Sequence, residues 1–226
     1  MLRKNRLFTP GPTPLLPAAQ TAMASFTAHH RTADFRQLFQ RVLADMKDFV
    51  GTQSDVLVLA CSGTGVMEAS VSNLTSPGDK VLVLTAGKFG ERWTGLARAF
   101  GCNVDVLSVP YGQTFSLHEI RAKVTPEVKA VFVQATESST GTRHDVEGIA
   151  KIVRASGDGT LLVVDAITGL GYLVNPVTTW TRVSAENHTS GRQKSWRKLD
   201  GLWAIQVDVP EAAGHVAKDN ADILLV

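Results

Sequence analysis

Five short runs of apolar residues recur along the middle of the chain. They occupy residues 56–61, 80–85, 104–109, 129–134 and 160–165, and most of their members are valine, leucine or isoleucine. Short apolar runs without polar alternation are typical of strands that are buried on both faces of a parallel sheet. The pattern therefore predicts five buried parallel strands.

Between these runs the apolar residues return every three to four positions, which is the helical period. Helices are predicted at residues 65–74, 88–100, 117–124 and 146–155. The second of them carries Phe89, Trp93, Leu96 and Phe100 on one stripe. Because strand and helix alternate along the chain, we expect a wound α/β sheet.

The two ends of the chain differ from this middle part. Residues 1–20 are rich in proline, which cannot pair in a central strand, so they predict an extended arm. A helix is predicted at residues 34–50, and its apolar residues are spaced for one buried side. They are Phe35, Leu38, Phe39, Val42, Leu43 and Met46. Beyond residue 172 the chain is polar until a strand-like run at 201–209. We therefore expect an arm (1–20), a main domain (21–172) and a divergent continuation (173–226).

Composition and charge narrow the possible partners. The net charge of +2 comes from scattered Lys and Arg without a basic run, so nucleic acid is not an expected partner. A membrane helix needs roughly 20 apolar residues in a row, and this chain has none, so a membrane partner is not expected either. No apolar signal core follows the basic N-terminus. Cys61 and Cys102 form no CxxC pair and are expected to be small buried residues. A reduced, cytoplasmic protein fits this pattern best.

Two places in the pattern carry candidate chemistry. The first predicted strand runs into Ser62-Gly63-Thr64-Gly65 and then into a helix, so hydroxyls and free N–H groups meet at a helix N-terminus. Such a turn suits a phosphate dianion, although many α/β proteins need it for steric reasons alone. It is neither a Walker loop nor a strict GxGxxG motif. Asp165 closes the fifth run, at the mouth where parallel sheets bind ligands. A helix cap or a buried ion pair is the alternative role for this carboxylate.

The order of the motifs resembles the class V aminotransferases, especially the serine–pyruvate and alanine–glyoxylate group. The resemblance runs from residue 7 to residue 171 through the segments Thr9-Pro10-Gly11-Pro12-Thr13-Pro14, His30-Arg31-Thr32-Ala33-Asp34-Phe35, Ser62-Gly63-Thr64-Gly65-Val66-Met67-Glu68-Ala69, Gly87-Lys88-Phe89-Gly90-Glu91-Arg92, Glu137-Ser138-Ser139-Thr140-Gly141 and Val164-Asp165-Ala166-Ile167-Thr168-Gly169-Leu170-Gly171. It implies the large domain of pyridoxal-phosphate fold type I, a three-layer α/β/α sandwich with a mostly parallel sheet.

The resemblance also implies a role for each matched site residue. Ser62, Gly63 and Thr64 would hold the phosphate of pyridoxal 5'-phosphate. Phe89 and Ile167 would cover the two ring faces, and each has a plain core role as its alternative. Ser138 would bond near the phenolic oxygen of the ring, unless its hydroxyl only stabilises a turn. Asp165 would pair with the pyridinium nitrogen.

The lysine that carries the cofactor is the remaining part of the pattern. Gly191-Arg192-Gln193-Lys194-Ser195 is the candidate segment, and Gly201-Leu202-Trp203-Ala204 follows at the spacing usual in the family. Lys194 would bind the cofactor covalently and then move the α-proton of the substrate, with Gln193 beside the cofactor. Residues 172–200 depart from the family pattern, through true divergence or a reading-frame artefact. A solvated surface lysine is the alternative role.

The implied activity is transfer of an amino group from a small amino acid, serine or alanine, to a 2-oxo acid, glyoxylate or pyruvate. The resemblance also implies a homodimer, and it leads us to expect that the family's small C-terminal domain is missing here. The alternatives are a truncated fold without catalysis, a nucleotide-binding domain, and a desulfurase or lyase. A nucleotide-binding domain would need an acidic residue after the second strand, where Leu84-Thr85-Ala86 stands, and a desulfurase would need a loop cysteine that this sequence does not offer.

Overall fold

The structure, a computed structural model, describes residues 11, 14–25, 28–50, 55–156, 159–170, 196–199 and 202–205. Its chain divides into two units, residues 1–45 and 46–226, each of which is described by itself. No described helix is long and apolar enough to cross a membrane.

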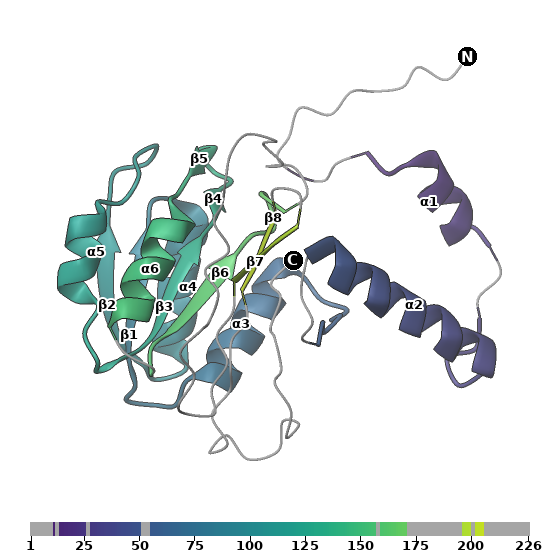
Figure 1. Cartoon of the computed structure of the whole chain (residues 1–226), viewed down its shortest axis with the longest axis horizontal. Helices are drawn as coiled ribbons and strands as arrows, with labels where there is room; N and C mark the ends of the chain where they lie inside the picture. The colour runs from purple at the N-terminus through teal and green to yellow at the C-terminus, as the bar shows by residue number, and fades with distance from the viewer. Residues whose placement is uncertain are drawn as a thin grey trace. The chain divides into compact units, whose positions relative to one another are not determined.

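A parallel sheet of four strands is the centre of the second unit (Figure 1). Its strands are β1 (Lys80–Thr85), β2 (Asn103–Ser108), β3 (Val128–Gln134) and β6 (Leu161–Asp165), in the order β2-β1-β3-β6. All three pairings are parallel, and the last pair brings Gln134 beside Asp165 at the carboxyl ends of their strands. Four of the five predicted strands are thus confirmed to within one residue.

The fifth prediction, a strand at residues 56–61, is wrong. This segment forms no strand, and Leu57, Val58 and Leu59 are about half exposed. A strand exists only through its pairing, and within the described residues no strand of the sheet pairs with this run. Val56 alone is buried, where it packs with Val50, Met46 and Leu170. Apolar composition alone is therefore not sufficient to predict a strand, because a strand also needs a neighbour with which to pair.

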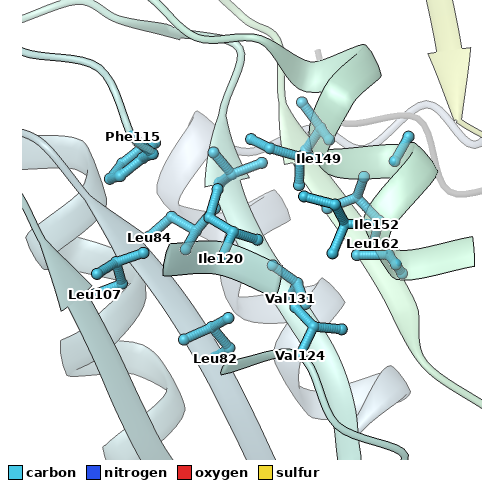
Figure 2. Close-up of a cluster of buried hydrophobic side chains, with 14 of the residues drawn as sticks. Leu82, Leu84, Leu107, Phe115, Ile120, Val124, Val131, Ile149, Ile152 and Leu162 are labelled. Atoms are coloured by element: carbon cyan, nitrogen blue, oxygen red, sulfur yellow. The ribbon is translucent and has the colours of Figure 1, made fainter. Parts of the chain in front are cut away.

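Helices cover both faces of the sheet. They are α3 (Gly63–Leu74), α4 (Lys88–Ala99), α5 (Leu117–Lys123) and α6 (Val146–Ala155), close to the predicted ranges. Successive strand residues point to opposite faces. Leu82 and Leu84 therefore meet α5 and α6 in one buried cluster (Figure 2), whereas Val81 and Val83 meet α3 and α4 in another. The resulting three layers confirm the α/β/α sandwich.

Two short antiparallel pairs of strands also belong to the described part of this unit. Strands β4 (Thr136–Glu137) and β5 (Thr142–Arg143) pair antiparallel directly after β3, and the sequence pattern did not predict them. Strands β7 (Trp196–Leu199) and β8 (Leu202–Ile205) pair antiparallel. β8 lies inside the strand-like run at 201–209, while β7 was not predicted.

The N-terminal part of the chain contains two helices, α1 (Pro17–Met23) and α2 (Ala33–Val50). The prediction of an extended arm to residue 20 is wrong from Pro17 onward, because a proline fits the first position of a helix, where no N–H is needed. α2 follows its prediction closely, but Leu38, Phe39 and Val42 on its apolar side are exposed. The periodicity predicted the helix correctly, but the prediction that its apolar side is buried is wrong for these three residues.

Close packing of α4 on β1 depends on a glycine. A Cβ atom on Gly90 would lie 2.7 Å from the Cα atom of Thr85, which is backbone and cannot rotate away. We expect Gly90→Ala to lower the free energy of unfolding by about 2 kcal/mol, as overpacking does. Gly95→Ala in the same helix is the matched control, since a Cβ there meets nothing within 4 Å.

The control should raise stability by about 0.5 to 1 kcal/mol, because alanine favours the helix over glycine. Urea unfolding followed by circular dichroism measures both changes. Equal stabilisation by both substitutions would show that α4 does not approach β1 this closely.

Candidate cofactor-binding site

The turn before α3 has the features of an anion site. α3 begins at Gly63, two residues earlier than predicted, and Ser62 is its N-cap. The hydroxyl oxygen of Ser62 accepts the N–H of Gly65 at 3.3 Å. The first amides of any helix have no carbonyl partner within it, and the helix dipole makes this end positive. Ser62, Gly63 and Thr64 therefore surround a position that favours a negative group.

Asp165 lies at the end of β6, and its carboxylate is held by the next turn. Its Oδ1 accepts the backbone N–H of Ile167 at 3.0 Å, and the residue is only 7% exposed. Burial raises the pKa of Asp165 above its ordinary value, and the N–H of Ile167 offsets part of that effect. A buried carboxylate of this kind gains most from a cationic partner placed beside it.

The two ends of the candidate site lie next to each other. A Cβ atom on Gly63 would come within 3.2 Å of the Cδ1 atom of Ile167, so the phosphate turn and the turn after β6 nearly touch. Ile167 is 49% exposed, which excludes the plain core role that was its alternative. The turn at Ser62–Gly65 and the carboxylate of Asp165 thus belong to one small region at the carboxyl ends of the strands.

Phe89 lies in the first turn of α4 and is half-buried. Two aromatic residues of the apolar stripe predicted on this helix differ in burial. Trp93 is fully buried against Phe132, with ring centroids 4.8 Å apart. Phe89 belongs to neither of the two large core clusters. The guanidinium carbon of Arg92 lies 4.9 Å from the centre of the Phe89 ring. Phe89 is therefore not a core residue, which was the alternative to its role at the cofactor ring.

Ser138 is half-buried and follows the short strand β4. Its hydroxyl forms a hydrogen bond with the hydroxyl of Thr168, which is the residue directly after Ile167. The contact ties the β4–β5 hairpin to the loop after β6. Ser138 therefore faces the same loop as Asp165 and Ile167, and the sequence had given no role to Thr168.

Glu137 is the residue whose importance the sequence did not reveal. It is 1% exposed, and its Oε2 accepts the N–H of Gly90 at 3.1 Å. Its Oε1 accepts the N–H of Phe89 at 3.4 Å and both the N–H and the hydroxyl of Ser139, at 3.1 and 2.6 Å. The carboxylate thus caps the N-terminus of α4, where the helix dipole favours negative charge. Glu137 stood in a quoted motif, but only the fold shows what it holds.

Gly87 makes this cap possible. A Cβ atom there would lie 2.5 Å from the Cγ atom of Glu137, so a larger residue would displace the buried carboxylate. The hydroxyl of Ser139 accepts the N–H of Lys88 at 3.2 Å and adds a second bond to the same turn. The start of α4, and with it Phe89, is therefore fixed from the β4 side.

The remaining residues named from the sequence are the two near the expected lysine and the two cysteines. Gln193 and Lys194 lie outside the described residues. Cys102 is buried as expected, but Cys61 is exposed, because it lies in the turn before α3 rather than in a strand. Among the described residues, no cluster of His, Cys, Asp or Glu could hold a metal ion.

Fold and site together define a wound α/β domain with an anion turn and a buried carboxylate at one edge of its sheet. The family profile of aminotransferase class-V matches residues 9–177, so the chain belongs to that family. Members of this family depend on pyridoxal phosphate. The resemblance stated from the motifs is therefore confirmed at the level of the family.

Individual relatives carry several names. The chain is similar to the soluble hydrogenase 42 kDa subunit of Anabaena cylindrica, with 38% identity over 90% of this chain and 53% of that protein. It is 32% identical to the serine–glyoxylate aminotransferase of Methylorubrum extorquens over 90% of this chain and 51% of that one.

Among solved structures, the alanine–glyoxylate aminotransferase of Nostoc sp. matches with a TM-score of 0.69 and 32% identity, over 76% of this chain and 46% of that chain. The chain thus spans about half the length of the curated relatives it matches.

Proposed function

We propose that this chain binds pyridoxal phosphate and forms the cofactor-binding part of a transaminase. The near contact between Gly63 and Ile167 carries the proposal, because it joins an anion-binding turn to a buried carboxylate. Pyridoxal phosphate has the complementary pair of groups, a phosphate and a basic ring nitrogen. Among the described residues, the donor set fits this cofactor better than a nucleotide, since no acidic residue follows β1, where Ala86 and Gly87 lead into α4.

Each side chain then has a definite task. Ser62, Gly63 and Thr64 bind the phosphate, and Asp165 holds a proton on the ring nitrogen. Phe89 and Ile167 cover the ring faces and keep water away, while Ser138 donates a hydrogen bond near the phenolic oxygen. When bound, the cofactor supplies an electron sink for the bond that breaks in the substrate.

Lys194 carries the catalytic part of the proposal. Its amine would hold the cofactor covalently and would move the α-proton of the substrate, with Gln193 beside it. The family match covers residues 9–177 and so ends before the lysine. Both residues lie outside the described part of the chain, so the assignment rests on the resemblance.

The proposed substrates are a small amino acid, serine or alanine, and a 2-oxo acid, glyoxylate or pyruvate. The names of the relatives from Methylorubrum and Nostoc support this class of substrate. We further propose that the chain works as a homodimer in the cytoplasm. A reducing compartment agrees with Cys61 and Cys102, which are both free.

Absorption spectroscopy with chemical trapping tests the proposal. The purified chain, incubated with pyridoxal phosphate, should gain a visible absorption band, and borohydride should then fix one cofactor covalently on Lys194. Peptide mass mapping locates the adduct, and Lys194→Ala should remove it. Prior incubation with L-alanine or L-serine should lower the yield, because a substrate amine displaces the lysine.

Three results would contradict the proposal in different ways. An adduct that forms equally in Lys194→Ala would mean that the lysine is wrongly assigned. An adduct on Lys194 that no amino acid diminishes would favour a fold without catalysis. No saturable binding of the cofactor at all would remove the proposed function.

A further inference from the structure

Arg92 is a charged side chain at the site to which the family motifs assign no role. It lies one helical turn after Phe89 in α4. Its Nη1 donates a hydrogen bond of 2.7 Å to the hydroxyl oxygen of Thr64, and its guanidinium carbon lies 4.9 Å from the centre of the Phe89 ring. One guanidinium thus contacts both the phosphate turn and the aromatic residue beside it.

Arg92 forms no direct ion pair within the described part of the chain, although its charge acts on the carboxylate of Asp165 from a distance and offsets part of the rise that burial causes in the pKa of that group. The nearby Lys88 is paired with Glu91 at 3.0 Å, but no described carboxylate forms an ion pair with Arg92. Its acceptor is a neutral hydroxyl. Guanidinium carries five N–H donors, so several are left for a further acceptor. A positive group that is held against an anion turn and has no direct ion-pair partner favours binding of an anion there.

The bond to Thr64 also orients the hydroxyl. A threonine hydroxyl has one proton to donate and two lone pairs with which to accept. Because Arg92 occupies a lone pair, the proton of Thr64 is directed to another acceptor, and the charged donor strengthens that second bond. In the absence of Arg92 the hydroxyl could turn toward the backbone of α3 instead.

We propose that Arg92 is the charged member of the phosphate subsite. Its guanidinium supplies positive charge to the cofactor phosphate and sets the hydroxyl of Thr64 to donate. The inference rests on the proposed function, because it assumes that the anion at this turn is the phosphate of pyridoxal phosphate.

Two ligands that differ only in the phosphate separate this role from a purely structural one. Dissociation constants for pyridoxal phosphate and for pyridoxal are measured by absorbance titration with the chain and its variants Arg92→Ala, Arg92→Gln and Arg92→Lys. Arg98→Ala, an exposed arginine in the last turn of the same helix, is the matched control. Circular dichroism confirms that each variant is folded.

Arg92→Ala and Arg92→Gln should weaken binding of pyridoxal phosphate about tenfold or more, as loss of a charged hydrogen bond does, and should leave pyridoxal within about twofold. Arg92→Lys should recover part of the loss, because charge persists but the planar fork does not. Raising the salt concentration should weaken binding to the unaltered chain more than to Arg92→Ala.

Equal weakening of both ligands, or of neither, would overturn the assignment of Arg92 and leave the proposed function standing. If the unaltered chain bound pyridoxal phosphate no more tightly than pyridoxal, the phosphate turn itself would be wrongly assigned. The two failures are therefore distinguishable in one set of titrations.

Discussion

Replacing Glu137 by alanine is expected to lower the free energy of unfolding by about 3 kcal/mol, the cost typical of losing one member of a buried charged network. The carboxylate is 1% exposed and accepts hydrogen bonds from Phe89, Gly90 and Ser139. Alanine would leave the buried N–H of Gly90 and the half-buried N–H of Phe89 without an acceptor, and it would leave a cavity beside Gly87. The first turn of α4 should then fray, and Phe89 with it.

Chemical denaturation measures the effect. Glu137→Ala should unfold at a urea concentration roughly 1 M lower with an unchanged dependence on urea, while Glu137→Gln should lose less because it keeps one acceptor oxygen. Glu127→Ala is the control, since its side chain is 81% exposed in a loose ion pair with Lys80, and exposed pairs contribute little. If Glu137→Ala and Glu127→Ala unfolded at the same urea concentration, the capping role of Glu137 would be refuted.

The hydrophobic pattern was sufficient to predict the sheet and its helices, because each buried strand must fill both faces with apolar residues. The alternation of Leu82 and Leu84 with Val81 and Val83 between two core clusters shows this requirement directly. The same reasoning failed for residues 56–61. There the pattern predicts only that the segment is apolar and extended. A strand also needs a neighbouring strand to pair with, and the sequence of the segment alone does not predict that partner.

The candidate site divides in the same way. Ser62 and Asp165 could be predicted because they end or follow apolar runs, where sheets bind ligands. Glu137 and Arg92 could not, because their roles depend on residues distant in sequence. Glu137 meets the turn at Phe89 and Gly90 only after β4 folds beside α4, and Arg92 reaches Thr64 across 28 positions of the chain. Periodicity carries no information about such contacts.

Asp165→Asn is expected to act in opposite directions on stability and on cofactor binding. Burial raises the pKa of Asp165 in the folded chain above its unfolded value. Such a group adds stability below the unfolded pKa, and this stability is lost as the pH rises through the folded pKa. Asparagine is neutral at every pH and can still accept the N–H of Ile167. The cofactor-free variant should therefore melt at a higher temperature than the unaltered chain at pH 8, with the difference vanishing in acid.

Binding should change the other way, because an amide cannot hold a protonated ring nitrogen by charge. Loss of one charged hydrogen bond of about 1.5 to 3 kcal/mol corresponds to a tenfold to hundredfold weaker affinity for pyridoxal phosphate. Asp105→Asn is the matched control, since it breaks the half-exposed pair with Lys123 at 2.8 Å, far from Ile167 in the sequence. That variant should melt no higher than the unaltered chain and bind the cofactor equally well.

Thermal melts of the cofactor-free proteins across pH, together with titrations of pyridoxal phosphate, measure both effects on the same samples. A cation placed beside the buried carboxylate would offset the cost of burying it, so we expect the two effects to occur together. If Asp165→Asn lowered the melting temperature at pH 8, or left the affinity for pyridoxal phosphate unchanged, Asp165 would be a structural cap and not the partner of the ring nitrogen.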